Sequence, residues 1–416
     1  MENIEDDEND IKKYNELKLL PTTLAEILPS TDLNIRLCSD YLLKGNIVGM
    51  PTETVYGLAA NAFDLKACEK IFEYKNRPFN DPLIVHVCSI EMAHSITNLN
   101  SQDEKIFGIL SKKFWPGPLT IILPANLNKI SKKILANGDT VGIRFPIHPI
   151  AKKLIEYSNV PIAAPSANKF CHISPVNPYH VFFDFKEYPI KILNGKKSEF
   201  SMESTVIKIE IKNDSKKIKI FRMGAIGKED IEKVLKENNV FDFEVEALVK
   251  KINLNQNEIK ELTENNSNEK NDITINQEAP GQFLKHYSPK LNAYIYSGND
   301  IKEYVKEIKL NSSILFIDYN KILYNQFINK NNIKEENFID LSKEGNPEEC
   351  MKNFYDYLHK AEEIKNKDII IFCDLEKFMK ENQHKLTLLD RMWKAASFKK
   401  CIIKENKLIL YKYYIV

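Results

Sequence analysis

Four short motifs lie between Gly45 and Asn168, and each sits where an apolar run of the chain ends. α/β enzymes place their ligand-binding loops at such points, directly beside the buried elements of the sheet. The chain is therefore expected to fold as an α/β enzyme with a ligand site in these loops. The motifs combine Pro, Gly, Ser, Thr and cations, and they occupy residues 50–57, 75–78, 141–146 and 164–168.

Strand-like and helix-like segments alternate along the first part of the chain. Helices are predicted at 32–43, with Asp32 as the cap, and at 65–74. The short interval between Thr205 and Ile220 indicates an antiparallel pair, so the sheet is expected to be mixed. The predicted strands are 46–50, 83–87, 119–123, 161–164, 190–193, 204–210 and 218–222.

A change of composition divides the chain. Residues 250–276 are rich in Asn and in charges of both signs and poor in apolar side chains, which is typical of a linker. Strand-like runs return at 293–296, 313–317 and 368–372, separated by helical stretches, and indicate a second, smaller Rossmann-like α/β unit. The expected organisation is a polar N-terminal extension (1–30), a catalytic domain (31–245), a linker with a lid segment (246–290) and a C-terminal domain (291–416).

The overall charge excludes a general attraction to nucleic acid or lipid. Lys and Arg total 59 against 58 Asp and Glu, so any contact with nucleic acid is expected to be local or indirect, through a partner. The cysteines form no Cys-x-x-Cys pair, and the N-terminus is acidic where a presequence would be basic. No apolar run approaches the ~20 residues that span a bilayer. A cytoplasmic protein without membrane contact is expected.

Two pairs of polar residues are suited to a nucleotide. Lys75 and Arg77 supply cations for a phosphate, and the loop after them is stiffened by Pro78 and by Asp81 with its following proline. Ser166 and Asn168 offer a hydroxyl and an amide to phosphate or ribose. The alternatives are a solvated cation pair at a helix end and a cap or turn. A loop cation such as Arg77 is expected to contribute little to folding.

The conjunction of Lys75-x-Arg77 with Ser166-x-Asn168 resembles the signature of the threonylcarbamoyl-AMP synthase family, whose enzymes are built on the YrdC domain. The resemblance implies a YrdC-like twisted mixed open sheet with helices, joined by a long linker to the smaller Rossmann-like domain. It also implies a nucleotidyltransferase that joins L-threonine, bicarbonate and ATP into threonylcarbamoyl-AMP and pyrophosphate. A downstream tRNA threonylcarbamoyl transferase complex would use that product to modify the tRNA adenosine next to the anticodon. Mg²⁺ would arrive with ATP, and no dedicated carboxylate cage is visible.

The same resemblance assigns roles to individual residues. Alternatives stay open: a backbone cap for Thr54 and Ser204, a satisfied strand-end histidine for His86, and surface ion pairs for Arg144 and Arg222. By resemblance, Lys75, Arg77, Ser166 and Asn168 serve catalysis; Thr54, His86, Arg144 and Ser204 bind L-threonine; and Arg77, Asp81, Thr140, Ser166, Ser174, Arg222, His286 and Tyr287 bind ATP.

The segment His286-Tyr287-Ser288-Pro289 resembles a stretch that folds over the active site in the two-domain branch of this family, with Ala in place of Ser288. A lid is therefore expected, and a plain turn is the alternative. Residues 389–397 resemble the last helix of the second domain, with Asp390 where Asn is expected.

The sequence also bears on three other functions. A P-loop kinase is excluded, because the first glycine required before Gly227-Lys228 would fall at Arg222. A hydrogenase-maturation carbamoyltransferase would need zinc-finger cysteine pairs, which the sequence lacks. An RNA-binding YrdC-like protein without synthase activity stays open as the alternative.

Overall fold

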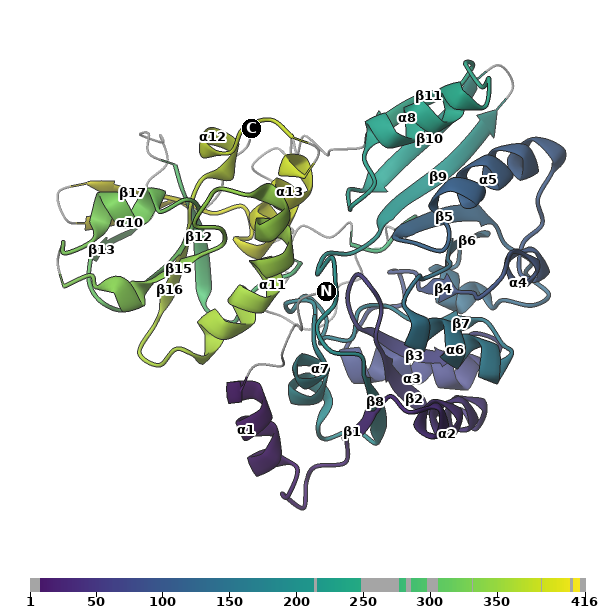
Figure 1. The fold of residues 1–416 in the computed structure, drawn as a ribbon, viewed down its shortest axis with the longest axis horizontal. Coiled ribbons are helices and arrows are strands. Elements are labelled where there is room, and N and C mark those ends of the chain that lie inside the picture. Colours follow the sequence, from purple (N-terminus) through teal and green to yellow (C-terminus); the bar gives the residue numbers. More distant parts are fainter. Residues whose placement is uncertain are drawn as a thin grey trace.

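Two sheets with their helices form two units in the computed structural model, which describes residues 8–212, 215–247, 277–281, 286–297, 306–330, 332–382, 384–404 and 407–411 (Figure 1). Most of the predicted linker lies outside the described residues. In the described part, the larger sheet has the order β1-β8-β2-β3-β7-β4-β6-β5-β9-β10-β11. Its strands are β1 Glu26–Pro29, β2 Ile47–Met50, β3 Gly57–Asn61, β4 Ile84–His86, β5 Leu119–Pro124, β6 Thr140–Arg144, β7 Ile162–Ala163, β8 Ile190–Asn194, β9 Thr205–Lys212, β10 Ser215–Arg222 and β11 Glu244–Ala247.

The larger sheet is mixed, as predicted. β4 and β6 are parallel, and β9 and β10 are antiparallel with Ile207 opposite Ile220. Helices cover both faces, because Ile47 and Val48, adjacent on β2, belong to different apolar clusters. The helices of this unit are α1 Glu8–Leu17, α2 Asp32–Leu43, α3 Leu65–Lys75, α4 Ile90–Ser95, α5 Ser101–Phe114, α6 Pro149–Ser158, α7 Pro178–Phe185 and α8 Lys228–Glu237, with a 3₁₀ turn at Lys132–Leu135.

Two details of the N-terminal part differ from the prediction. The cap of α2 is Thr31, whose hydroxyl accepts the Asn34 N–H, and Asp32 is the first helical residue. The expected polar extension contains α1 and β1. β1 pairs in parallel with β8, and Tyr14 of α1 packs edge-on against Phe182 of α7 with ring centroids 4.8 Å apart. These residues are thus part of the folded unit.

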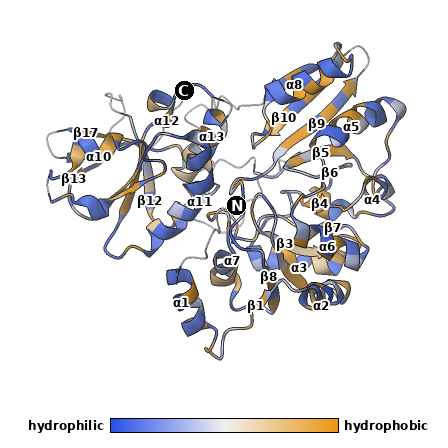
Figure 2. Ribbon diagram, viewed as in Figure 1, coloured by the Kyte–Doolittle hydropathy of each residue, from blue (hydrophilic) through white to orange (hydrophobic). Residues whose placement is uncertain are grey.

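The smaller sheet has, in the described residues, the order β13-β18-β17-β12-β16-β14-β15. The neighbouring strands β12, β16, β14 and β15 are parallel, with β15 at the edge, and β18 is antiparallel to both its neighbours. Figure 2 shows apolar residues along the strands of both sheets. The strands are β12 Asn292–Tyr296, β13 Lys306–Lys309, β14 Ile314–Asp318, β15 Phe338–Asp340, β16 Ile369–Phe372, β17 Lys400–Lys404 and β18 Lys407–Tyr411; the helices are α10 Ile322–Phe327, α11 Pro347–Glu363, α12 Leu375–Phe378 and α13 Lys385–Ala395, with a 3₁₀ turn at Glu335–Asn337.

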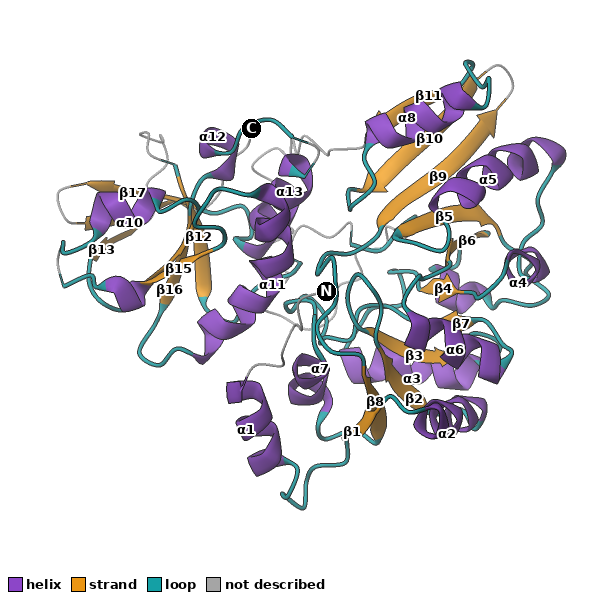
Figure 3. Ribbon diagram, in the orientation of Figure 1, coloured by secondary structure: helices purple, strands orange, loops and turns teal. Residues whose placement is uncertain are grey.

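The two units share buried contacts. α11 and α13 lie on the side of the smaller unit that faces the larger one, and loop segments gather beside them (Figures 1 and 3). The apolar cluster of the smaller unit includes four residues of the larger one, Val55, Ile173, Val176 and Met202. The smaller unit is therefore packed against the loops of the larger unit.

Candidate active site

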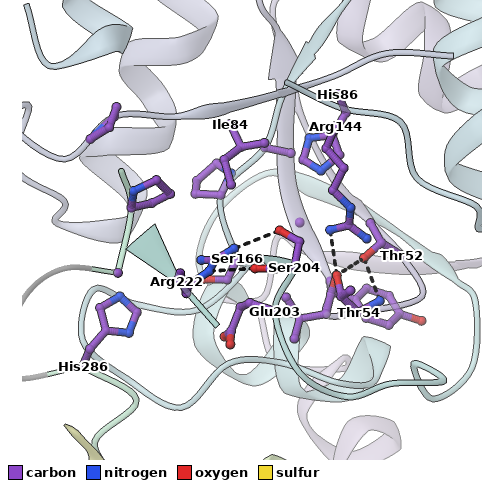
Figure 4. A pocket seen from close by; sticks show the side chains of 18 of the residues that line it. Thr52, Thr54, Ile84, His86, Arg144, Ser166, Glu203, Ser204, Arg222 and His286 are labelled. Atoms are coloured by element: carbon purple, nitrogen blue, oxygen red, sulfur yellow. Dashed lines mark hydrogen bonds between the residues drawn. The ribbon is translucent and has the colours of Figure 1, made fainter. Parts of the chain in front are cut away.

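A pocket with about 560 Å³ of empty space, part of it open to solvent, lies where these loops meet. Figure 4 shows His86 and Arg144 on one side of the pocket, Arg222, Ser166 and His286 toward the other, and Ser204 between them. Its lining is Thr52, Thr54, Val55, Tyr56, Gly57, Arg77, Pro82, Ile84, His86, Arg144, Ala164, Pro165, Ser166, Glu203, Ser204, Arg222, Pro280, Gly281, His286 and Tyr287.

Arg144 closes β6 and is held by the loop between β2 and β3. Its Nη2 lies 2.6 Å from Glu53 Oε1, its Nη1 donates to Thr54 Oγ1 at 2.8 Å, and its Nε donates to Gly117 O at 3.4 Å. The Thr52 hydroxyl lies 2.9 Å from that of Thr54. Arg144 therefore forms a buried ion pair, and not the surface pair considered as its alternative.

His86 ends β4 directly opposite Arg144 on β6. It shares a face of β4 with Ile84, because side chains alternate along a strand. Burial, followed by the neighbouring Arg144 charge, lowers the pKa of His86 to about 3. Its Nδ1 has no hydrogen-bond partner among the described residues. The ring is thus neutral and has a polar atom available to a ligand.

Ser204 and Arg222 meet at the start of β9 and the end of β10. Arg222 donates from Nη2 to Ser204 Oγ and from Nε to Ser204 O, both at 3.0 Å. Thr120 on β5 shares a hydrogen bond of 2.8 Å with Ser204 Oγ. These bonds fix a cation and a hydroxyl beside each other on the pocket wall.

The Lys75–Arg77 motif is formed by the end of α3. Asn76 is the C-cap in the left-handed conformation, with φ 54°, which Asn tolerates better than most residues. The turn separates the two cations. Arg77 lines the pocket, while Lys75 Nζ donates to the carbonyls of Ser166 at 2.6 Å and Asn168 at 2.5 Å. Neither cation is solvated, since both side chains are buried.

Lys75 thus ties the two halves of the signature together. Burial, followed by the nearby Arg77 charge, lowers the pKa of Lys75 well below its usual value. Ser166 lines the pocket, whereas the Asn168 amide donates to the carbonyls of Lys169 and His172 and faces away from the lining. Lys75 and Asn168 therefore support the loop that presents Ser166.

Three other predicted nucleotide residues lie outside the lining. Asp81 is buried and pairs with Arg77 Nη2 at 3.0 Å. Ser174 donates its hydroxyl to Glu203 Oε1 at 2.5 Å. Thr140 lines a neighbouring hollow that shares Pro82, Ile84 and Pro280 with the pocket.

The described residues of the predicted lid complete the pocket. Pro280, Gly281, His286 and Tyr287 line it, and Tyr287 has a positive φ of 58°. Both aromatic side chains are buried, and neither His286 Nδ1 nor the Tyr287 hydroxyl has a hydrogen-bond partner among the described residues. Burial, followed by the Lys394 charge, lowers the pKa of His286, so this ring is also neutral.

Sequence reasoning missed Glu203, Thr52 and Tyr56 in the lining. Glu203 is a lone acidic residue directly before the predicted strand that starts at Ser204. A charged residue at the end of a loop beside a buried strand could have indicated a place in the site. Its carboxylate is fully engaged: Oε1 accepts from Ser174, and Oε2 accepts from Tyr355 at 2.9 Å and Arg391 at 3.0 Å.

Within the part of the chain that the structure describes, no group of three or more His, Cys, Asp or Glu side chains is arranged to hold a metal ion. The same residues include no helix that is both long and apolar enough to cross a bilayer.

Comparisons with known proteins agree on one family. Residues 40–224 match a family described as Telomere recombination, and residues 226–397 match one described as Threonylcarbamoyl-AMP synthase, C-terminal domain. The chain is 41% identical over 204 residues, 49% of its length, to a threonylcarbamoyl-AMP synthase of Pyrococcus abyssi. That match spans 57% of the relative, little more than half of its length. A threonylcarbamoyl-AMP synthase of Psychromonas ingrahamii is 32% identical over 142 residues, which are 34% of this chain and 72% of the relative.

A solved structure resembles the whole arrangement. It is the crystal structure of Pyrococcus abyssi Sua5 complexed with L-threonine, and it superimposes with a TM-score of 0.67 at 27% identity. The superposition covers 90% of this chain and 98% of the other. The two sheets are thus arranged in a fold similar to that of one known protein.

Proposed function

The chain belongs to the threonylcarbamoyl-AMP synthase family, and from this premise we propose that it forms threonylcarbamoyl-AMP and pyrophosphate from L-threonine, bicarbonate and ATP. One observation carries the proposal. A single pocket is lined by a guanidinium–hydroxyl pair at each of two places, Arg144 with Thr54 and Arg222 with Ser204. An amino acid and a nucleotide each need such a cation and hydrogen-bonding partner.

L-Threonine is assigned to the part of the pocket beside Arg144. Glu53 and Thr54 bind the two terminal nitrogens of the guanidinium, so its orientation is set before any ligand arrives. The ligand can contact only the edge that these two residues leave free. The neutral His86 can accept a hydrogen bond from the substrate ammonium or hydroxyl at Nδ1, an atom without a protein partner in the described residues. The related Pyrococcus protein was solved with L-threonine, which supports this assignment.

The ATP phosphates are assigned to Arg77, Arg222 and Ser166. In the proposed reaction the threonine amine adds to carbon dioxide formed by dehydration of bicarbonate, and gives an N-carboxylate. An oxygen of that carboxylate then bonds to the α-phosphorus, the bond from this phosphorus to the bridging oxygen breaks, and pyrophosphate leaves. The protein contributes position and positive charge, because no covalent step on a side chain is required.

A Mg²⁺ ion is proposed to come with the nucleotide. Glu203 has both carboxylate oxygens engaged, Asp81 is paired with Arg77, and Glu53 is paired with Arg144, so these carboxylates do not form a cluster suited to a protein-held ion. Mg²⁺ prefers phosphate oxygens and water as ligands in such sites, where it neutralises phosphate charge.

Pro280, Gly281, His286 and Tyr287 are proposed to retain the nucleotide. His286 and Tyr287 present unpartnered polar atoms to a pocket from which water must be excluded, since the mixed anhydride product is labile. Lys75 and Asn168 are proposed to support the loop that carries Ser166. Asp81 and Ser174 are proposed to act on the nucleotide through Arg77 and Glu203, and Thr140 from the adjoining hollow.

The proposal is tested by measuring pyrophosphate release with each substrate omitted in turn and identifying threonylcarbamoyl-AMP by mass spectrometry. Release is expected only when L-threonine and bicarbonate are both present. Serine is expected to be poorer by about fivefold, because one lost buried methyl costs on the order of 1 kcal/mol. Threonine-independent release at the same rate would contradict the proposal, and RNA binding without any release would favour the non-catalytic alternative.

A further inference from the structure

Arg391 lies on α13 of the smaller unit, 188 residues after Glu203, and is completely buried at the boundary with the larger unit. Its Nε donates to Glu203 Oε2 at 3.0 Å, and its Nη2 donates to Met223 O at 2.8 Å. Its Nη1 pairs with Asp390. All three guanidinium nitrogens are therefore engaged, and two of them bind the larger unit.

The two residues that Arg391 holds flank the Ser204–Arg222 pair. Glu203 precedes Ser204, and Met223 follows Arg222. Arg391 itself does not line the pocket. It can act on the substrate site only through the residues it positions.

Arg391 also supports the covering segment. Its guanidinium carbon lies 5.0 Å from the centroid of the Tyr287 ring, within cation–π distance. On the same helix, Lys394 Nζ donates to Gly281 O at 2.9 Å. One helix of the smaller unit thus contacts both the wall and the cover of the pocket.

The charges add a second constraint. Glu203 is 4% exposed, and its field reaches two cations, Arg391 and Arg222. While Arg391 neutralises Glu203, Arg222 stays on Ser204 and faces the pocket. If the Arg391 charge were lost, the buried carboxylate would draw Arg222 away from the phosphate position.

We infer that Arg391 is a positioning residue for the nucleotide, which neutralises Glu203 and so keeps Arg222 directed at the pocket. The inference rests on the proposed function for the identity of the ligand. It makes the smaller unit a part of the substrate site rather than an attached module.

The test compares four full-length proteins: the unaltered chain, Arg391→Met, the double variant Glu203→Gln/Arg391→Met, and Thr387→Val. The last is the matched control, because it removes another bond between α13 and the larger unit, from Thr387 Oγ1 to Gly224 O at 3.1 Å, and leaves Glu203 paired. KM and kcat for ATP are measured at saturating L-threonine and bicarbonate. Thermal unfolding of each protein is recorded in parallel.

Arg391→Met is expected to raise KM for ATP about tenfold while kcat stays within about threefold. The double variant removes the uncompensated charge and is expected to bring KM back to within about threefold of the unaltered chain. A purely structural role predicts the opposite, since the double variant lacks both partners. Thr387→Val is expected to retain the original KM.

An unchanged KM in Arg391→Met, or a double variant as impaired as the single one, would overturn the inference. If Arg391→Met fails to fold, Arg391→Lys replaces it, because this change keeps a positive charge beside Glu203 and alters the other bonds of the guanidinium. A KM for ATP within about threefold of that of the unaltered chain then supports the inference, and a rise of about tenfold overturns it. Should the unaltered chain release no pyrophosphate, the proposed function fails, and calorimetric ATP binding by the same proteins still decides the role of Arg391.

Discussion

Arg144 and Glu53 show how a cation that lines the pocket can be fixed in place by a buried acid. The pair is 2.6 Å apart, and both side chains are almost fully buried. Arg144 binds Glu53 Oε1, and Glu53 Oε2 has no hydrogen-bond partner among the described residues. Removing Arg144 therefore affects both ligand binding and folding, and the two effects can be separated.

We predict that Arg144→Ala raises KM for L-threonine and lowers the free energy of unfolding by about 3–5 kcal/mol, because a buried carboxylate loses its partner. Threonine titrations and urea unfolding measure the two effects. Glu53→Gln/Arg144→Met should recover much of the stability and none of the threonine affinity. Full recovery of both would place threonine elsewhere.

The structure corrects the expectation that Arg77 contributes little to folding. Arg77 is 7% exposed, pairs with Asp81 at 3.0 Å and donates to Pro82 O at 2.8 Å. Arg77→Ala is therefore predicted to destabilise the protein by about 3–5 kcal/mol as well as to weaken ATP binding. Chemical unfolding of the variant measures the first effect, with Arg36→Ala, an exposed ion-paired cation on α2, as the control. An unchanged unfolding midpoint for Arg77→Ala would contradict this account.

The sequence predicts helices and strands correctly where residues close together in the chain determine the secondary structure. The run at 83–87 contains β4, the run at 119–123 covers β5 except for Pro124, and the helix at 32–43 is α2. α1 and β1 were missed, because a polar helix and a four-residue strand acquire their stability from distant partners on α7 and β8. The role of Glu203 was missed for the same reason, since Arg391 follows it by 188 residues.

The contact between α7 and α11 should make stability depend on pH. His180 and His359 stack with ring centroids 3.7 Å apart, and burial lowers the pKa of both below the ordinary value of 6.5. Asp10 Oδ2 lies 3.6 Å from His180 Nε2, while the charges of Lys197 and Lys360 oppose protonation of His180. Because the unfolded chain binds more protons, stability is present above about pH 6.5 and is lost as the pH falls below it.

We predict that the thermal midpoint declines between about pH 7.5 and about pH 5.5, and that His359→Phe, which keeps the stacking, reduces the decline. Differential scanning calorimetry at several pH values measures it. An identical decline in the variant would show that His359 does not contribute.

For the whole molecule, the shared apolar cluster bears on truncation. A chain ending at residue 247 would expose Val55, Ile173, Val176 and Met202, and would leave Glu203 without Arg391. We predict that it folds, because the larger sheet has its own core, but unfolds at a lower temperature and retains ATP poorly. Calorimetry and ATP binding test this, and a truncated chain with full activity would contradict it.

The contact between Glu203 and α13 also sets an order of events during synthesis. Chains emerge from the ribosome N-terminus first, so the larger sheet can form while α13 is still being made. Until then the carboxylate of Glu203 lacks the Arg391 cation, and by the inference above Arg222 is expected to shift toward it. On the proposed function, a nascent chain is therefore expected to use ATP poorly until α13 has been made and has reached Glu203.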